Sequence, residues 1–585
     1  MSIRKNLKRV LPFLLCAVIA TSTFAGCGNS TGGSTSTGDA STAGSSTGAA
    51  STSSESAPAE TGTATGDANI LRYGTTSIEG RFNPIMSDNV YDGYVVDCIF
   101  ESLIITDEEG IYVPSNIATY EMSEDNRTYT FTLKDGVTFS DGTPMTTEDV
   151  KFTYEAIGHP DYTGPRGYAI ANLEGIDEFK ANYAGGLSGI QIIDEKTISF
   201  TYQEASPANI ADLVYGIMPK HYYEFENFAD FTALMDKPLG SGRMVLDAFE
   251  PKQYTQMSRN ETYWDTSTAA KIDGILINDV PKESLLGAMQ TGQIDFCQPD
   301  ANEDNYAAFN DLSNASARTF VGNGYTFMAF NTTRPTLSDV RTRQALMYAL
   351  DRETFIDAVY GPNLASVGLA PFSPTSWAFP DVSELNAYPF DMDKAQQLMS
   401  DAGWNKESDG YLYKDGQKFS VTWLVYTEAE WPGVLSGLAA DSWKQLGVDL
   451  TIELLDFNTV SDRTMDAPVG DKDFDIYTMG FSLSADPDPK GALFDADAYT
   501  EGGFNATGYR NDRAQELIAL GRTEFDQAKR EEYYVEFAKL MNEEIPTVIV
   551  AYRNEIWAIN DRINGMDFNA FKKWPFFLDQ ITLSE

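Results

Sequence analysis

The chain has 585 residues, with 42 Lys and Arg against 86 Asp and Glu, two histidines and four cysteines. This length is sufficient for several domains or large lobes, each with a sizeable core. The formal charge of −44 repels polyphosphates, so no nucleic-acid partner is expected. So few histidines and cysteines predict no cofactor and no zinc, haem or iron–sulfur site.

The N-terminus has the layout of a secretory signal. Four basic residues precede an apolar run at residues 10–20, which is too short to span a membrane. The sequence Phe24-Ala25-Gly26-Cys27 resembles the lipobox of bacterial lipoproteins, although Phe24 stands where Leu is usual. The resemblance implies a signal peptide at 1–26 and lipidation of Cys27. The alternative is an ordinary cleaved signal with an incidental cysteine.

Residues 27–66 follow as a tether. Nearly all of them after Cys27 are Gly, Ser, Thr or Ala, and none is large and apolar, so this segment is expected to be disordered. A lipidated cysteine followed by a disordered tether predicts a protein anchored to the extracellular face of a cell membrane. If an outer membrane is present, this location is the periplasm. Beyond the tether only Cys98 and Cys297 remain, either as a disulfide or as two free thiols.

The body of the chain predicts a mixed α/β fold. Strands are expected at residues 70–74 and 128–133, and Thr146 begins a helix with acidic residues in its first turn. A helix is expected at 339–350. Further along, strands at 420–426 and 448–455 flank a helix at 435–446.

Residues 129–150, YTFTLKDGVTFSDGTPMTTEDV, carry the strongest signal in the sequence. This stretch resembles the signature of the extracellular solute-binding proteins of peptide and nickel ABC importers, which include the oligopeptide- and dipeptide-binding proteins. Further family marks occur in order at Arg259-Asn260, Tyr263-Trp264-Asp265, 292–295, 339–352 and 401–404. The resemblance covers the whole body.

The resemblance implies an α/β, two-lobed, periplasmic-binding-protein-like fold. Lobe I would comprise residues 67–322, with an extra inserted subdomain, and the C-terminal return at 552–585. Lobe II would comprise 323–551. Gly322 and Gly324 would form part of the hinge, since glycine can absorb the backbone rotation of closure. A plain turn is the alternative role for each glycine.

In the family, an extended ligand pairs with a strand edge of each lobe. By position, the lobe I segment includes Ser77, Ile78 and Glu79. The lobe II segment comprises Gly480, Phe481, Ser482, Leu483, Ser484 and Asp486. Three aromatic residues, Tyr325, Trp423 and Tyr426, are further candidates for ligand contact, although core packing is the alternative role for each.

The lobe II segment departs from the best-described members, which have an aspartate for the peptide ammonium where this chain has Ser484. Asp486 could replace it, or could simply shape an Asp-Pro turn. The ligand expected from the resemblance is an oligopeptide, delivered by a monomeric receptor to ABC permease subunits. An oligosaccharide or another extended, amine-free solute is the alternative. No nucleophile–base pair or metal constellation is present, so an enzyme is not expected.

Overall fold

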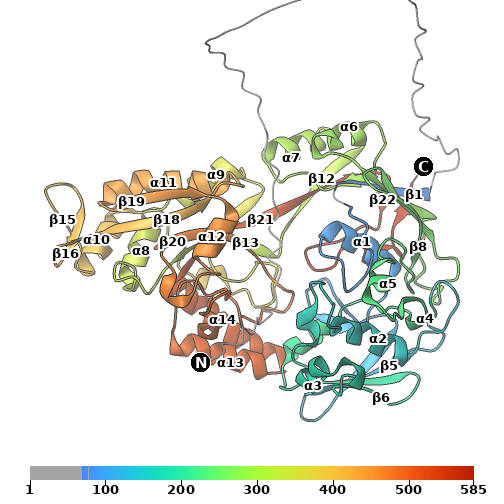
Figure 1. Cartoon of the computed structure of the whole chain (residues 1–585). Helices are drawn as coiled ribbons and strands as arrows, with labels where there is room; N and C mark the ends of the chain where they lie inside the picture. The colour runs from blue at the N-terminus through green and yellow to red at the C-terminus, as the bar shows by residue number, and fades with distance from the viewer. Residues whose placement is uncertain (1–68, 77, 585) are drawn as a thin grey trace, which may run out of the picture.

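The structure, a computed structural model, describes residues 69–76 and 78–584. Two lobes lie side by side and are joined by strands (Figure 1). The largest sheet continues through both lobes in the order β19-β18-β20-β13-β21-β11-β1-β10-β9-β8, and β12 and β14 also pair with β21. These strands are β1 (Ile70–Thr75), β8 (Met244–Glu250), β9 (Tyr254–Arg259), β10 (Gly274–Asp279), β11 (Phe296–Cys297), β12 (Ala315–Val321), β13 (Gly324–Phe330), β14 (Ala365–Val367), β18 (Ser420–Tyr426), β19 (Asp449–Leu455), β20 (Ile476–Ser482) and β21 (Thr547–Asn560). The expected α/β class is confirmed.

Lobe I has its own apolar core, drawn from residues between Leu71 and Phe296 and again from Trp557 to Ile581. An aromatic group lies at its centre, where the ring centroids of Tyr73 and Phe296 are 4.6 Å apart. A second sheet, in the order β4-β5-β7-β6, forms the extra subdomain. The remaining elements of lobe I are β2 (Ile104–Thr106), β3 (Tyr112–Pro114), β4 (Ala118–Met122), β5 (Thr128–Leu133), β6 (Ile190–Ile192), β7 (Thr197–Thr201), β22 (Ile563–Asn564), β23 (Thr582–Leu583), α1 (Val90–Ile99), α2 (Thr147–Ile157), α3 (Ile176–Ala181), α4 (Lys220–Tyr223) and α5 (Phe228–Thr232).

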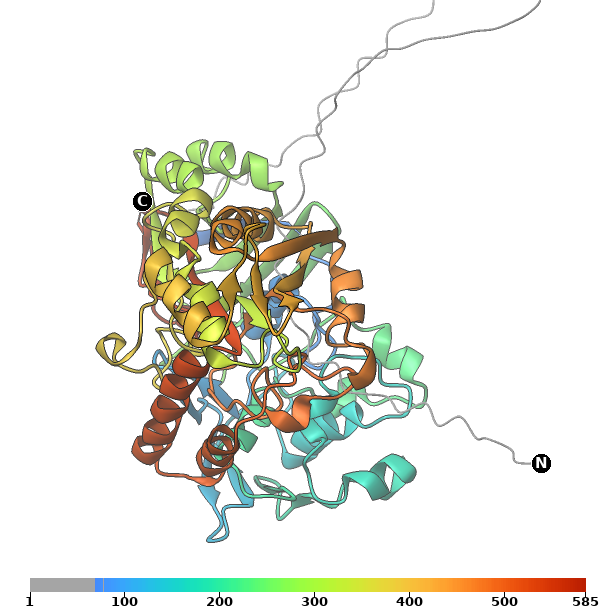
Figure 2. The ribbon, with the colours of Figure 1, turned by 90° about the vertical axis from the view of Figure 1, so that its left-hand side faces the viewer.

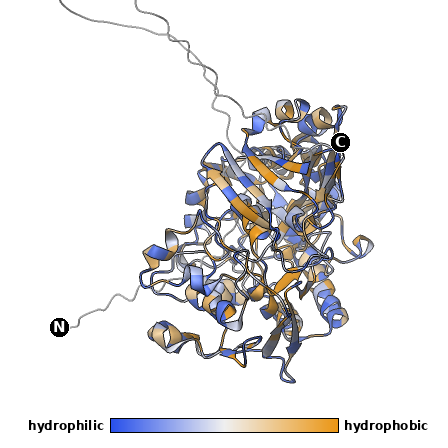
Figure 3. Cartoon of the chain, turned by 90° about the vertical axis from the view of Figure 1, so that its right-hand side faces the viewer, coloured by the Kyte–Doolittle hydropathy of each residue, from blue (hydrophilic) through white to orange (hydrophobic). Residues whose placement is uncertain are grey.

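Lobe II has a second core, drawn from residues between Tyr325 and Ile556. Figure 2 views this lobe from its own side, with α13 and α14 in dark red below the sheet. Its helices and small strands are α8 (Val340–Tyr348), α9 (Arg352–Val359), α10 (Met392–Asp401), α11 (Trp431–Leu446), α12 (Phe457–Arg463), α13 (Asp512–Thr523), α14 (Gln527–Glu544), β15 (Asn405–Lys406), β16 (Leu412–Lys414) and β17 (Gln417–Lys418). Apolar residues, in orange in Figure 3, concentrate on the interior strands.

Two chain segments cross between the lobes. In the first, β12 turns into β13 through Gly322 and Asn323. The second is β21, which pairs with β13 over residues 547–551 and with β12 over residues 554–560. A third, small core lies against β12 under α6 (Leu285–Gln290) and α7 (Glu303–Asn310). The middle of β21 is therefore shared by the two lobes.

Local sequence signals account for most element boundaries. The Asp149 carboxylate accepts a hydrogen bond from the Thr146 amide at 2.8 Å, which caps α2 as the acidic first turn predicts. The helix expected at 435–446 begins earlier, at Trp431, because Pro432 fits the first turn of a helix. Cys98 and Cys297 are both buried and free, so of the two alternatives the structure has free thiols. Within residues 69–76 and 78–584, no helix is long and apolar enough to cross a membrane.

Candidate functional site

β20 has an unpaired backbone edge at its carboxyl end. β18 lies beside β20 only at the pairs Trp423↔Ile476 and Leu424↔Tyr477, whereas β13 pairs with β20 as far as Ser482. On the β18 side, residues 478–482 therefore have no neighbouring strand in the part of the chain that the structure describes. Thr478 and Met479 are buried, so the accessible part of this edge is residues 480–482. An accessible strand edge can accept an extended chain as an additional strand.

The side chains along this edge alternate in exposure. Ser482 and Ser484 are exposed, whereas Phe481 and Leu483 are half-buried. The Phe481 ring stacks on Tyr325, with centroids 5.9 Å apart and planes inclined by 24°. A Cβ at Gly480 would approach only the Tyr325 carbonyl oxygen, at 4.0 Å. The face of Gly480 on which a side chain would lie is therefore open, and a ligand can approach the backbone closely there.

Asp486, at the end of this segment, forms a buried ion pair. Its two carboxylate oxygens accept hydrogen bonds from Nη1 and Nη2 of Arg530, both at 2.9 Å. The Arg530 guanidinium also lies 5.3 Å from the ring centroid of Trp377. The Asp486 carboxylate also accepts from the Asp488 amide. Of the two roles predicted for Asp486, the structure favours the shaping of the turn, because Arg530 already neutralises its charge.

The same loop touches lobe I. The Tyr112 side chain lies against the Asp486 backbone, and burial raises the pKa of the phenol. Arg522 on α13 pairs with Asp488 at 2.9 Å. Its positive charge also lies near Asp212 of lobe I and favours the ionised form of that carboxyl group. Burial is the larger effect, however, and the pKa of Asp212 is well above its usual range. The two lobes are thus in contact on this side.

On lobe I, a buried carboxylate fixes the loop after β1. Asp92, which is fully buried in α1, accepts hydrogen bonds from the backbone amides of Glu79 and Arg81, both at 2.9 Å, and from Gly80 at 3.4 Å. This arrangement holds Ile78, which is half-buried, and Glu79, which is exposed, directly after the end of β1. Sequence reasoning missed Asp92, because nothing in its neighbourhood distinguishes it from an ordinary acidic residue of a first helical turn.

The crossing strand β21 carries two charged side chains on one face, Arg553 and Glu555. Glu555 accepts hydrogen bonds from Gln298 at 2.9 Å and from the Trp557 indole at 3.2 Å. Arg553 is half-buried, and its backbone oxygen accepts from the Gly322 amide at 2.9 Å. These residues lie where the chain passes between the lobes, and the sequence analysis singled out neither of them.

A further carboxylate on α1, Asp97, is half-buried and has no hydrogen-bond partner among the residues described. Burial raises its pKa to about 6, although the positive charges of Lys573 and Arg166 act in the opposite direction. No ion pair joins the three in the described chain. Asp97 thus lies near two positive charges, Lys573 and Arg166, without forming an ion pair with either.

The structure brings some of the predicted residues together and separates others. Tyr325 lies beside the segment at 480–486, whereas Trp423 has no exposed surface and stacks on Trp443 in the lobe II core, 5.5 Å between centroids. Trp423 is therefore a packing residue. Tyr426 is 6% exposed at the end of β18, where its ring packs edge-on against Trp431. Ser77 and the predicted lipidation residue Cys27 lie outside the described residues.

The two predicted hinge glycines differ. Neither Gly322 nor Gly324 has a left-handed backbone conformation. A Cβ at Gly324 would lie 2.6 Å from the Phe481 carbonyl oxygen, whereas the nearest atom at Gly322 would be the Arg553 oxygen at 3.4 Å. Gly324 is thus required for the close approach of β13 and β20. The sequence alone does not reveal this requirement for glycine.

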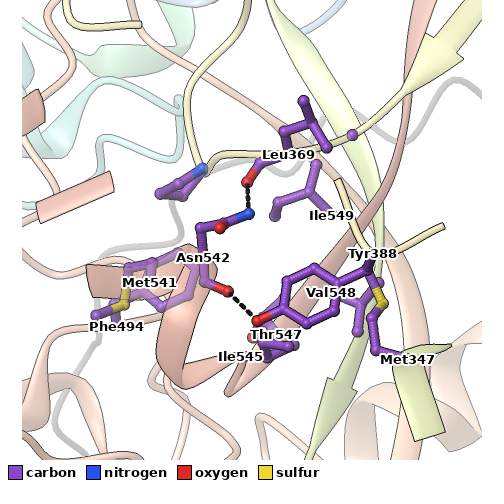
Figure 4. Close-up of a pocket in the computed structure, with 12 residues that line it drawn as sticks. Met347, Leu369, Tyr388, Phe494, Met541, Asn542, Ile545, Thr547, Val548 and Ile549 are labelled. Carbon is purple, nitrogen blue, oxygen red and sulfur yellow. Dashed lines mark hydrogen bonds between the residues drawn. The ribbon is translucent and has the colours of Figure 1, made fainter. Parts of the chain in front are cut away.

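Two hollows of the structure lie away from this region. The small hollow of Figure 4 lies inside lobe II. There the Asn542 side-chain amide donates a hydrogen bond to the Leu369 carbonyl at 2.9 Å, and the Asn542 backbone carbonyl accepts one from the Tyr388 hydroxyl at 3.0 Å. A shallower hollow lies on lobe I beside His159. No cluster of His, Cys, Asp or Glu suited to a metal ion occurs within the described residues. The candidate site is therefore defined by the strand edge and the crossing strand.

Comparison with known proteins identifies the relatives of this chain. Residues 112–502 match the family described as bacterial extracellular solute-binding proteins, family 5 middle. The oligopeptide-binding protein AppA of Bacillus subtilis is 25% identical over 493 residues, which cover 83% of this chain and 87% of AppA. Two solved structures share the fold. AppA from Bacillus subtilis in complex with a nonapeptide has a TM-score of 0.66 and 24% identity, covering 88% of this chain and 99% of that one. NikZ from Campylobacter jejuni in complex with Ni(L-His) has a TM-score of 0.66 and 21% identity, again covering 88% and 99%.

The fold and these matches define the class as a two-lobed solute-binding protein. The chain belongs to family 5 of the bacterial extracellular solute-binding proteins, the peptide and nickel family of ABC transporters. Members of this family bind a solute and do not convert it, so the chain is not an enzyme. The resemblance and the two-lobed fold expected from the sequence are both confirmed.

Proposed function

We propose that this chain is a lipid-anchored extracellular receptor that captures oligopeptides between its lobes and delivers them to an ABC permease. The observation that carries the proposal is the edge of β20, which has no strand beside it on the β18 side and is accessible at residues 480–482. An extended peptide can add to this edge by main-chain hydrogen bonds, which do not depend on the identity of its side chains. On lobe I, the segment Ser77–Ile78–Glu79 would supply the second edge.

Capture requires the lobes to move relative to each other. Lobe I would consist of residues 67–322 and 552–585, and lobe II of residues 323–551, with the hinge at the two crossing segments. A ligand that touches both lobes only when they are closed shifts the equilibrium towards the closed form. The Tyr112–Asp486 contact and the proximity of Asp212 to Arg522 support a closed arrangement in which the two lobes meet.

The anchor follows from the N-terminal sequence. Cys27 would carry the lipid, and residues 28–66 would tether a monomeric receptor to the membrane. Confinement near the membrane raises the effective concentration of the receptor at its permease. The mass of the N-terminal peptide of the protein isolated from membranes tests this assignment. A diacylglyceryl group on Cys27 is expected, and an unmodified cysteine would contradict the anchor.

A second ligand class is favoured by the loop at 484–486. Ser484 carries no charge, and both oxygens of Asp486 are bound by Arg530. No carboxylate of this turn is thus left to bind a free ammonium group. The ligand could then be an oligosaccharide or another amine-free solute, or a peptide held through its internal residues.

Calorimetric titration of the mature protein separates these ligands. The probes are a mixed-sequence hexapeptide, the same peptide with an acetylated N-terminus, and a linear hexasaccharide. Similar affinities for the two peptides would support recognition of the main chain without an ammonium contact. Binding of the hexasaccharide alone would replace the peptide proposal with the oligosaccharide.

A further inference from the structure

Arg553 lies at the point where β21 leaves one lobe and enters the other. Residues up to Ala551 pair with β13 of lobe II, and those from Asn554 pair with β12. Arg553 itself stands opposite Ala365 of β14. In Figure 1, β21 runs as a red strand between the lobes, beside β12. A side chain at this position is within reach of both lobes.

The Arg553 guanidinium lacks a protein acceptor. Of the described arginines that are not exposed, it is the one whose side chain makes no hydrogen bond and no ion pair. By contrast, the Arg530 side chain bonds Asp486 and the Gly521 carbonyl, and Arg352 bonds the carbonyls of Ile549 and Ala387. A guanidinium presents five donors, so an unpaired and half-buried one is an unfilled site for an acceptor.

Two carboxylates of this region already bond other groups. Glu555, two residues further along β21, bonds Gln298 and Trp557. Glu428, at the end of β18, accepts from the backbone amides of Phe457 at 2.8 Å and Thr427 at 3.2 Å. Neither carboxylate bonds Arg553, so its guanidinium is open to an acceptor from water or from the ligand.

The surroundings of Arg553 contain phenols that stay neutral. Tyr360 is 7% exposed and Tyr426 is 6% exposed. Burial raises the pKa of Tyr426 to about 12, and the positive charge of Arg553 acts on both phenols in the opposite direction. Both are uncharged at neutral pH, so neither cancels the guanidinium charge. Partial burial reduces the dielectric screening of that charge and strengthens its attraction for an anion.

We propose that Arg553 binds a carboxylate of the captured solute, either the terminal carboxylate of a peptide or an Asp or Glu side chain within it. This inference rests on the proposed function, and it adds a preference for acidic ligands. A carboxylate fits a guanidinium in a bidentate manner, which fixes the position of the ligand between the lobes as well as binding it.

Four peptides test the proposal on the mature protein. Two share one sequence and end in a free carboxylate or an amide. The other two are amidated and carry Asp or Asn at the central position. The wild-type protein is expected to bind at least one carboxylate form about tenfold more tightly than its neutral counterpart, and the pair that shows the difference identifies the source of the carboxylate.

Arg553→Gln is expected to bring this ratio close to one while leaving the affinity for the neutral peptides unchanged, and Arg553→Lys should restore part of it. Arg510→Gln is the matched control, because Arg510 is an exposed arginine whose side chain makes no hydrogen bond and no ion pair in the described chain. If Arg553→Gln weakened all four peptides equally, or if the ratio survived the substitution, the inference would be wrong. Peptide binding without any discrimination would contradict the inference alone. A wild-type protein that bound none of the four would contradict the proposed function as well.

Discussion

Asp486 and Arg530 form a bidentate ion pair with two N···O distances of 2.9 Å, directly after the strand edge proposed to bind the ligand. Both side chains are almost fully buried, with 8% and 6% of their surfaces exposed. The pair joins the loop at 484–488 to α14, and the same loop contacts Tyr112 of lobe I. The ion pair therefore fixes the loop at which the two lobes meet.

Removal of the Arg530 charge is expected to destabilise the protein strongly. Arg530→Met leaves the Asp486 carboxylate buried without a counter-charge, and a broken buried pair costs about 3–5 kcal/mol. Urea unfolding measures the loss. Arg513→Met is the control, because its pair with Glu536 is exposed, with 42% and 50% of the side-chain surfaces accessible. That substitution should cost less than about 1 kcal/mol. Equal losses for the two variants would contradict the assignment.

Asp97→Asn is expected to change how stability depends on pH. Burial raises the pKa of Asp97 to about 6 in the folded protein, against about 3.9 in an unfolded chain. The folded protein therefore binds more protons between these values, and the free energy of unfolding falls as the pH rises through this window. Above about pH 6 the loss is complete, on the order of 3 kcal/mol.

The Asp97→Asn variant should consequently be more stable than the wild type at pH 7 and equal to it near the lower end of that window. Thermal unfolding across the pH range provides the measurement. Glu531→Gln removes an exposed carboxylate of α14 and serves as the control. A stability difference for Asp97→Asn that did not vary with pH would show that the carboxylate is fully solvated in the folded state.

Gly324→Ala and Gly322→Ala form a matched pair at the crossing segment. The methyl group at residue 324 would lie 2.6 Å from the Phe481 carbonyl oxygen, so β13 and β20 would have to separate. A cost of about 1–3 kcal/mol is expected, together with weaker ligand binding, because the edge of β20 would shift. At residue 322 the nearest atom is 3.4 Å away, and the change should be tolerated. Loss of binding in Gly322→Ala alone would indicate that hinge rotation, rather than strand approach, is limiting.

Asp92→Asn tests the loop that would supply the lobe I edge. The carboxylate accepts from three backbone amides, and an amide side chain has only one acceptor oxygen for them. Unsatisfied amides cost about 1–3 kcal/mol, and release of the loop should weaken peptide affinity about tenfold. Asp88→Asn, which removes the ion pair with Arg81 at the surface, should leave affinity unchanged. If the two variants bound peptides equally well, the loop at 78–81 would not form part of the site.

The sequence predicted the architecture better than the site. Strand alternation and helix caps were sufficient for β5, β18 and α2, because these signals are local. The role of Asp486 was not decided by the sequence, because its partner Arg530 is 44 residues away and belongs to a helix of ordinary composition. Trp423 has the residue type of a ligand-stacking ring, and only tertiary packing against Trp443 shows that it belongs to the core. Arg553 had no sequence signal, since an unpaired charge is recognised only when all its neighbours are known.

Identification of the ligand that co-purifies with the protein tests the central claim most directly. Native mass spectrometry of the mature protein gives the bound mass, and denaturation followed by fragmentation gives its chemistry. The account predicts a population of peptides of mixed sequence, because an unpaired strand edge binds the main chain and not particular side chains. A single non-peptide solute, such as a glycan, would contradict peptide capture and favour the alternative suggested by Ser484.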